Sequence, residues 1–107
     1  MRERDDMTFP FSEYQRRLSD LRERMKERLL DAVIISDAEN IMYLTDYQTT
    51  GYSFFQALVV PLDGEPWMVT RKLEESNVHA RTWVELTRPY RDSGDAIQML
   101  VLSLIHI

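Results

Sequence analysis

The sequence contains no cysteine, only three glycines in 107 residues, and no apolar run long enough to cross a bilayer. Without cysteine there is no disulfide, thiolate nucleophile or cysteine metal site, and this composition fits a reducing, cytoplasmic compartment. Three glycines leave little material for a phosphate-binding loop. A membrane-spanning helix needs about 20 apolar residues. The apolar segment 97–107 is shorter and contains Gln98, Ser103 and His106, so we expect no membrane partner.

An excess of positive charge is also missing. The chain has 18 acidic and 13 basic residues, and its net charge is −5. An acidic surface repels a phosphate backbone, which argues against a nucleic-acid partner. The sequence has no His-Glu-x-x-His or Gly-x-Ser-x-Gly motif, and neither His79 nor His106 has clear partner ligands. The residues therefore predict no metal site and no self-sufficient catalytic centre.

The region 12–29 has the pattern of an amphipathic helix. Ser12 and Gln15 are spaced as a capping box, which places the helix start at Ser12. Nearly all the intervening positions are charged, which indicates one buried and one solvated face. The apolar residues that recur at helical spacing are Tyr14, Leu18, Leu21, Met25 and Leu29.

The remaining elements alternate between strand and helix patterns. Residues 31–36, "DAVIIS", predict a strand buried on both faces. Ser36 and Glu39 suggest a second capping box, for a short helix through "ENIMYL". Residues 54–62 predict another buried strand, and Asp63-Gly64 predicts a hairpin to the strand "WMVT".

A helix over "RKLEESNVHA", a strand over "WVELTRPY" and a helix capped by Asp95 complete the predicted order. Helices and strands in this order predict an α/β domain, and the hairpin requires a mixed sheet. We expect a flexible arm at 1–11 and a single domain at 12–101 that is incomplete at its C-terminus.

Aromatic residues crowd the otherwise polar segment 40–56. Tyrosine and phenylalanine at a loop mouth suit a small organic substrate, because they supply apolar walls and hydroxyl groups. Tyr43 and Phe55 are expected in the core, whereas core and substrate roles are equally open for Tyr47, Tyr52 and Phe54.

Arg71 follows the strand "WMVT", and strand ends commonly present functional groups. An arginine there could bind a carboxylate through a bidentate pair of hydrogen bonds from its guanidinium. An ion pair with Glu74 or Glu75 is an equally good interpretation of Arg71.

Two long stretches resemble one protein family. "FSEYQRRLSDLRERM…LDAVIISDAENIMYLTDYQTTGY" and "ALVVPLDGEPWMVTRKLE" are similar to the N-terminal domain of the creatinase, prolidase and Xaa-Pro aminopeptidase family. These are pita-bread metallohydrolases, and ectoine hydrolases belong among them. The likeness covers about residues 11–100. Asp46 stands where the family often has glycine, and aspartate tolerates the left-handed turn expected there.

The resemblance implies a ribonuclease-H-like, non-catalytic domain with a mixed sheet flanked by helices. In the family a divalent metal pair (manganese, cobalt or zinc) is bound by two aspartates, a histidine and two glutamates of a C-terminal domain. This chain lacks that domain. The implied partners are the missing catalytic domain, a second copy in a homodimer, and a small peptide or amino-acid-derived substrate. We expect the fragment alone to be inactive.

By the same resemblance, Tyr52 and Phe54 fall where related enzymes place side chains that contact substrate in the neighbouring subunit. The predicted substrate-binding residues, acting in trans, are Tyr47, Tyr52, Phe54 and Arg71. No catalytic or metal-binding residue is assigned. The alternative is a free-standing, non-enzymatic interaction module of the same fold.

The last six residues, 102–107, do not follow the family. "LSLIHI" reads like a translation of CTG-TCT-CTT-ATA-CAC-ATC, a transposon end used as a sequencing adapter. We therefore expect 102–107 to be a non-native tail that marks where a longer protein was cut.

Overall fold

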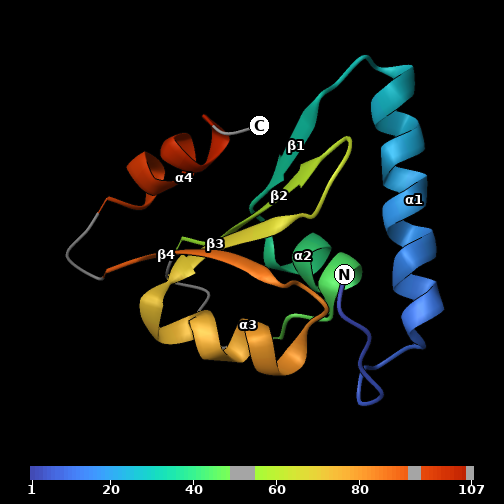
Figure 1. Ribbon diagram of the computed structural model, residues 1–107, viewed down its shortest axis with the longest axis horizontal. Helices are drawn as coiled ribbons and strands as arrows, with labels where there is room; N and C mark the ends of the chain where they lie inside the picture. The colour runs from blue at the N-terminus through green and yellow to red at the C-terminus, as the bar shows by residue number, and fades with distance from the viewer. Residues whose placement is uncertain (49–54, 92–94, 106–107) are drawn as a thin grey trace.

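The computed structural model describes residues 1–48, 55–91 and 95–105, and its elements follow the predicted order (Figure 1). One mixed sheet with the strand order β1-β2-β3-β4 is flanked by helices, which confirms the predicted α/β class. The elements are α1 (Phe11–Glu27), β1 (Ala32–Ile35), α2 (Ala38–Thr45), β2 (Ala57–Pro61), β3 (Trp67–Arg71), the 3-10 turn η1 (Lys72–Glu74), α3 (Glu75–Arg81), β4 (Leu86–Tyr90) and α4 (Ala96–Leu104).

The strand pairing confirms the predicted hairpin. β2 pairs antiparallel with both β1 and β3, and Leu58 of β2 lies opposite Met68 of β3. Gly64 in the connecting turn has a φ of 98°, a conformation that glycine adopts without steric cost. β3 and β4 are parallel, which requires the crossover through η1 and α3.

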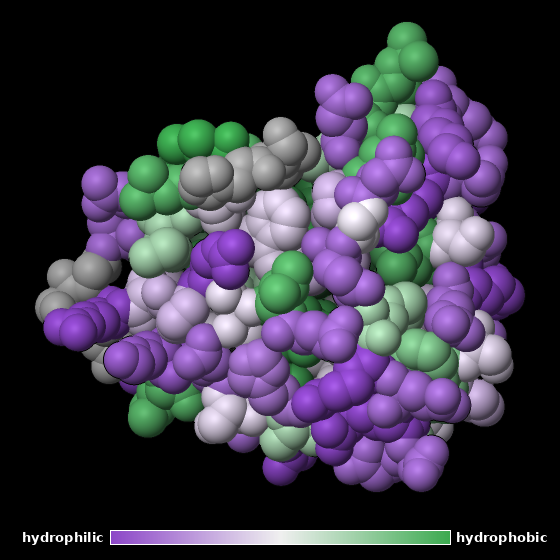
Figure 2. All heavy atoms as spheres, in the orientation of Figure 1, coloured by the Kyte–Doolittle hydropathy of each residue, from purple (hydrophilic) through white to green (hydrophobic). Residues whose placement is uncertain are grey.

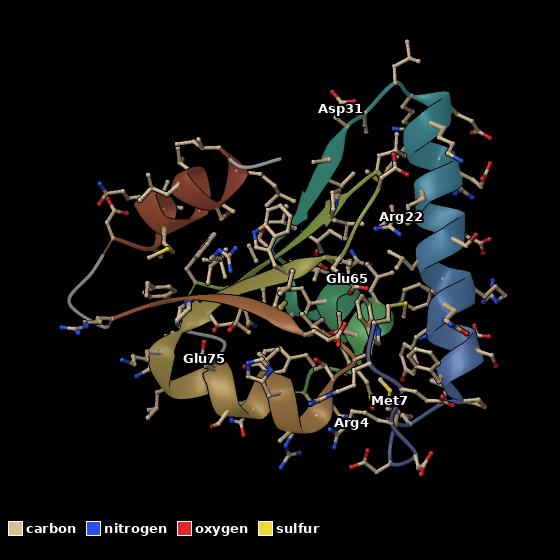
Figure 3. All side chains as sticks on the ribbon, in the orientation of Figure 1. Arg4, Met7, Arg22, Asp31, Glu65 and Glu75 are labelled. Carbon is tan, nitrogen blue, oxygen red and sulfur yellow. The ribbon has the colours of Figure 1, made fainter. Side chains whose placement is uncertain are left out.

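Both faces of the sheet centre are covered, which explains why β2 is apolar at every position. α1, α2 and α3 pack on one face, and α4 packs on β3 and β4 at the other (Figure 1). Because strand side chains alternate, Leu58 and Val60 enter the first core cluster while Ala57 and Val59 enter the second. Arg22 ties α1 to the hairpin: its Nε donates to the Pro61 carbonyl at 3.2 Å (Figure 3).

The prediction that β1 is buried on both faces is wrong. Ile34 is 45% exposed, because β1 is an edge strand and α4 covers only the opposite half of that face. The prediction that Leu29 belongs to the buried side of α1 is also wrong. The helix ends at Glu27, and Leu29 is 91% exposed at a φ of 58°.

Neither predicted capping box forms. α1 begins at Phe11, directly after Pro10, and no side chain caps it, so Ser12 is already inside the helix. A proline fixes its own φ and suits the entry to a helix, which moves the start ahead of Ser12. At α2 the capping residue is Asp37 rather than Ser36, and its carboxylate accepts the N–H three residues on.

The predicted cap of α4 is confirmed: Asp95 accepts the N–H groups of Ile97 and Gln98 at 3.0 and 3.1 Å. The helix continues through residues 102–104, and Ser103 is buried. The outer side of α4 remains apolar and exposed, which Figure 2 shows as a green patch over this helix; its exposed residues are Ile97, Val101, Leu102 and Ile105. Whether 102–107 is native stays a prediction. None of the described helices is both long and apolar enough to cross a membrane.

The N-terminal arm, expected to be loose, lies against the domain. The backbone N–H of Arg2 donates to the Trp83 carbonyl at 2.9 Å, and Met1 and Met7 pack against the first core cluster. Figure 3 shows Arg4 near the end of α3, where it donates to the His79 carbonyl at 3.2 Å, and Met7 near the start of α1. Apolar contact and backbone hydrogen bonds therefore hold a segment that has no regular structure.

Candidate functional site

The end of α2 positions the first candidate residue, Tyr47. Asp46 closes the helix in the left-handed region, with a φ of 66°, so the turn survives the replacement of glycine as predicted. The chain then turns inward and buries Tyr47 to 2% exposure. Its hydroxyl lies 2.9 Å from Oε2 of Glu74, which also accepts Asn77 Nδ2 at 3.0 Å. Tyr47 is thus a core residue whose polar end reaches the start of α3.

Arg71 is positioned by the ends of the two adjacent parallel strands, β3 and β4. It is the last residue of β3, it is partly buried, and it lies directly opposite Tyr90 of parallel β4. The Tyr90 hydroxyl donates to the Phe55 carbonyl at 2.6 Å. The prediction that Phe55 belongs to the core is confirmed, because its side chain packs against the second core cluster.

We call these residues the strand-end site: Tyr47, Phe55, Arg71, Glu74 and Tyr90. Arg71, Glu74 and Tyr90 lie at or just after the carboxyl ends of β3 and β4. Tyr47 reaches this end of the sheet through its hydrogen bond to Glu74, and it packs in the first core cluster whereas Tyr90 packs in the second. The Arg71 guanidinium is the group suited to bind the carboxylate of a small amino-acid-like molecule, because the hydroxyls of the buried Tyr47 and Tyr90 already bond within the chain. Tyr52 and Phe54, the other two predicted residues, lie outside the described residues.

Sequence reasoning missed Glu74 as the partner of Tyr47 and considered it only for Arg71. Separations of 27 and 35 residues join Tyr47 to Glu74 and Tyr90 to Phe55. No local spacing rule links residues that far apart. The only signal in the sequence was the placement of Arg71 and Glu74 just after an apolar strand, which indicates a strand end.

The prediction that Tyr43 lies in the core is wrong. Its side chain is 49% exposed, because Ile41 and Leu44 form the inward face of the short helix α2. The Arg17 guanidinium lies 4.1 Å from the centre of the Tyr43 ring and donates to the Tyr43 carbonyl at 2.7 Å. This cation–π contact joins α1 to α2 at the surface.

A groove of about 550 Å³ opens between α1, the edge strand β1 and α2, and we call it the β1 groove. Its lining includes apolar side chains from all three elements and charged residues of α1. The lining includes Leu21 and Leu44 from the two helices, Val33 and Ile34 from β1, and the charged Asp20 and Arg24 of α1.

Charged groups also meet at the N-terminal amine of Met1. Burial of the Met1 amine disfavours its charge, but hydrogen bonds to the carboxylates of Glu65 and Glu85 outweigh this and raise its pKa above the ordinary 8.0. No set of three or more histidine, aspartate or glutamate side chains in the described part of the chain could hold a metal ion.

Residues 17–106 match the family described as the Creatinase/Prolidase N-terminal domain. The chain is 32% identical over 83 residues to ectoine hydrolase of Halomonas elongata, covering 74% of this chain and 20% of that protein. It is 31% identical over 87 residues to an uncharacterised hydrolase/peptidase of Sinorhizobium fredii, covering 78% and 22%. It therefore spans about a fifth of the length of these curated relatives.

Solved structures show the same fold. Dipeptidase PepE from Mycobacterium ulcerans superposes with a TM-score of 0.76 at 24% identity, over 90% of this chain and 27% of that one. The creatinase/prolidase N-terminal domain of an X-Pro dipeptidase from Streptococcus pyogenes gives a TM-score of 0.71 at 21% identity, over 79% and 64%. With the family match across most of its length, the chain belongs to the creatinase/prolidase N-terminal domain family.

Proposed function

We propose that this chain is the non-catalytic N-terminal domain of a two-metal hydrolase that cleaves C–N bonds, of the Xaa-Pro peptidase, creatinase or ectoine hydrolase type. The observation that carries the proposal is the family match over residues 17–106, together with similarity to only a fifth of ectoine hydrolase. In this proposal the manganese, cobalt or zinc pair and the bond-breaking step belong to a separate catalytic domain. The metal pair of that domain would supply the chemistry that activates water and polarises the scissile carbonyl.

The strand-end site is the part of this domain that we assign to substrate selection, in the active site of a neighbouring subunit. Arg71 stands at a strand end with a guanidinium suited to a substrate carboxylate. Tyr47 acts by position, because its buried ring and its hydrogen bond to Glu74 hold the end of α2 beside that strand end. Tyr52 and Phe54 complete the proposed wall on the strength of the family resemblance. The substrate is a small peptide or amino-acid derivative.

The first test is the continuation of the open reading frame. A downstream segment with two aspartates, a histidine and two glutamates at the family's positions supports the hydrolase. A stop codon or unrelated sequence contradicts it and leaves the free-standing interaction module.

The second test measures steady-state kinetics of the complete enzyme. We expect Arg71→Ala to reduce kcat/KM by at least about tenfold, because a two-pronged contact to a carboxylate is lost. Arg88→Ala is the matched control, since Arg88 is an exposed arginine of β4 that donates to the adjacent Thr87 carbonyl. Equal, unchanged kinetics in Arg71→Ala and Tyr52→Ala would remove both residues from the site.

A further inference from the structure

The two outer strands of the described sheet differ in how their edges are protected. β4 contains Arg88 and Pro89, and natural sheets use charge and proline to prevent unwanted strand pairing. β1 reads Ala-Val-Ile-Ile and has neither. Its edge is therefore the one suited to accept another strand.

The register identifies which backbone groups are available. Leu62 N–H donates to the Asp31 carbonyl at 2.8 Å, and the same register places Val33 opposite Val60. Because hydrogen-bonded and non-bonded pairs alternate in an antiparallel ladder, Val33 bonds to β2 while Ala32 and Ile34 direct their N–H and C=O groups outward. Within the described part of the chain these outward groups have no hydrogen-bond partner.

We propose that this edge pairs with β1 of a second copy of the chain, antiparallel about a twofold axis at Val33. In that register Ala32 lies opposite Ile34 of the second copy, and the reverse holds on the other side of the axis. The outward groups of both residues then meet as hydrogen-bonded pairs. The half-exposed Ile34 side chain packs beside Ala32 of the second copy.

The charged residues that line the β1 groove are also complementary to those of a second copy of the chain. Asp20 and Arg24 lie one turn apart on α1 and both line the groove. A twofold axis reverses their order, so the acid of one copy faces the base of the other. β1 has only four residues, and we assign the additional affinity to this helix contact. The inference rests on the neighbouring subunit that the proposed function assumes and is independent of its substrate wall.

Sedimentation equilibrium of the 107-residue chain tests the interface, with circular dichroism to verify folding. We expect a dimer whose Kd rises at least about tenfold in Ile34→Lys. Ala32→Pro should act alike, since it removes an N–H that the β1–β2 ladder does not use. Leu86→Lys is the matched control: Leu86 is 41% exposed on the other edge strand, on the same face as Ile34.

A charge exchange and hydrogen exchange give independent measurements. Asp20→Arg should weaken the dimer, and adding Arg24→Asp should restore it. The amides of Ala32 and Ile34 should gain protection as protein concentration rises, whereas the Val33 amide is protected throughout by β2.

A chain that stays monomeric overturns the inference, as does equal weakening by Ile34→Lys and Leu86→Lys. Loss of the dimer only in Val101→Lys also overturns it, and moves the interface to the outer side of α4. None of these results affects the hydrolase assignment, which the reading frame tests separately.

Discussion

The contact between Asp46 and the N-terminal arm makes a sharp prediction about stability. The Asp46 carboxylate accepts the backbone N–H of Thr8 at 2.9 Å and the Thr8 hydroxyl at 2.8 Å. Asp46 is itself buried and holds the left-handed turn that ends α2. Asp46 therefore anchors the arm through its carboxylate and also adopts a left-handed backbone conformation, which glycine would adopt at a lower cost.

The hydrogen bonds and the backbone conformation contribute different free energies to stability. Hydrogen bonds to charged groups contribute about 1.5–3 kcal/mol each, and the lower value applies because Thr8 is exposed. Losing both costs about 3 kcal/mol. A left-handed conformation costs a residue other than glycine roughly 1 kcal/mol. We expect Asp46→Gly to lower the free energy of unfolding by about 2 kcal/mol, and Asp46→Ala by about 3 kcal/mol.

Urea denaturation followed by circular dichroism measures these changes. Thr8→Val removes the hydroxyl and keeps the backbone N–H, so a double-mutant cycle with Asp46→Gly should give a coupling of about 1.5 kcal/mol. Trypsin should also cleave after Arg4 faster in Asp46→Gly, because the arm loses an anchor. A variant Asp46→Gly as stable as the parent, with zero coupling to Thr8, would refute this account.

Three further changes test other parts of the fold. Trp83→Phe should lower the free energy of unfolding in urea by about 2 kcal/mol, because the fully buried indole N–H donates to the Leu44 carbonyl at 2.7 Å. An unchanged midpoint of the urea transition would contradict this. Asp95→Ala should cost about 1 kcal/mol by removing the cap of α4, whereas Asp95→Asn should cost less. The raised pKa of the Met1 amine means that its stabilising contribution is fully present below pH 8 and is lost as pH rises through the folded pKa. Thermal unfolding across that range should show the decline, and Glu65→Gln combined with Glu85→Gln should flatten it.

Much of the fold follows from local patterns. Helical spacing of Tyr14, Leu18 and Met25 identified the buried side of α1, and Asp63-Gly64 identified the hairpin. These features depend on periodicity and turn chemistry, which act over a few residues.

The candidate site was predicted less completely. Arg71 was placed at a strand end, and its register with Tyr90 agrees with that placement. Pairing of Tyr47 with Glu74 was missed, because the contact depends on how the end of α2 meets the start of α3. Tyr43 was assigned to the core although it lies on the surface, because the inward side of a two-turn helix is set by its neighbours.

The sequence by itself determined the order and type of the elements, the hairpin, the α/β class and the family resemblance. Tertiary structure decided which apolar surfaces are covered. β1 and β2 are equally apolar in sequence, yet only β2 is buried at every position, because α4 comes from a distant part of the chain and packs on β3 and β4. Coverage of a face depends on where remote elements dock, and no local pattern carries that information.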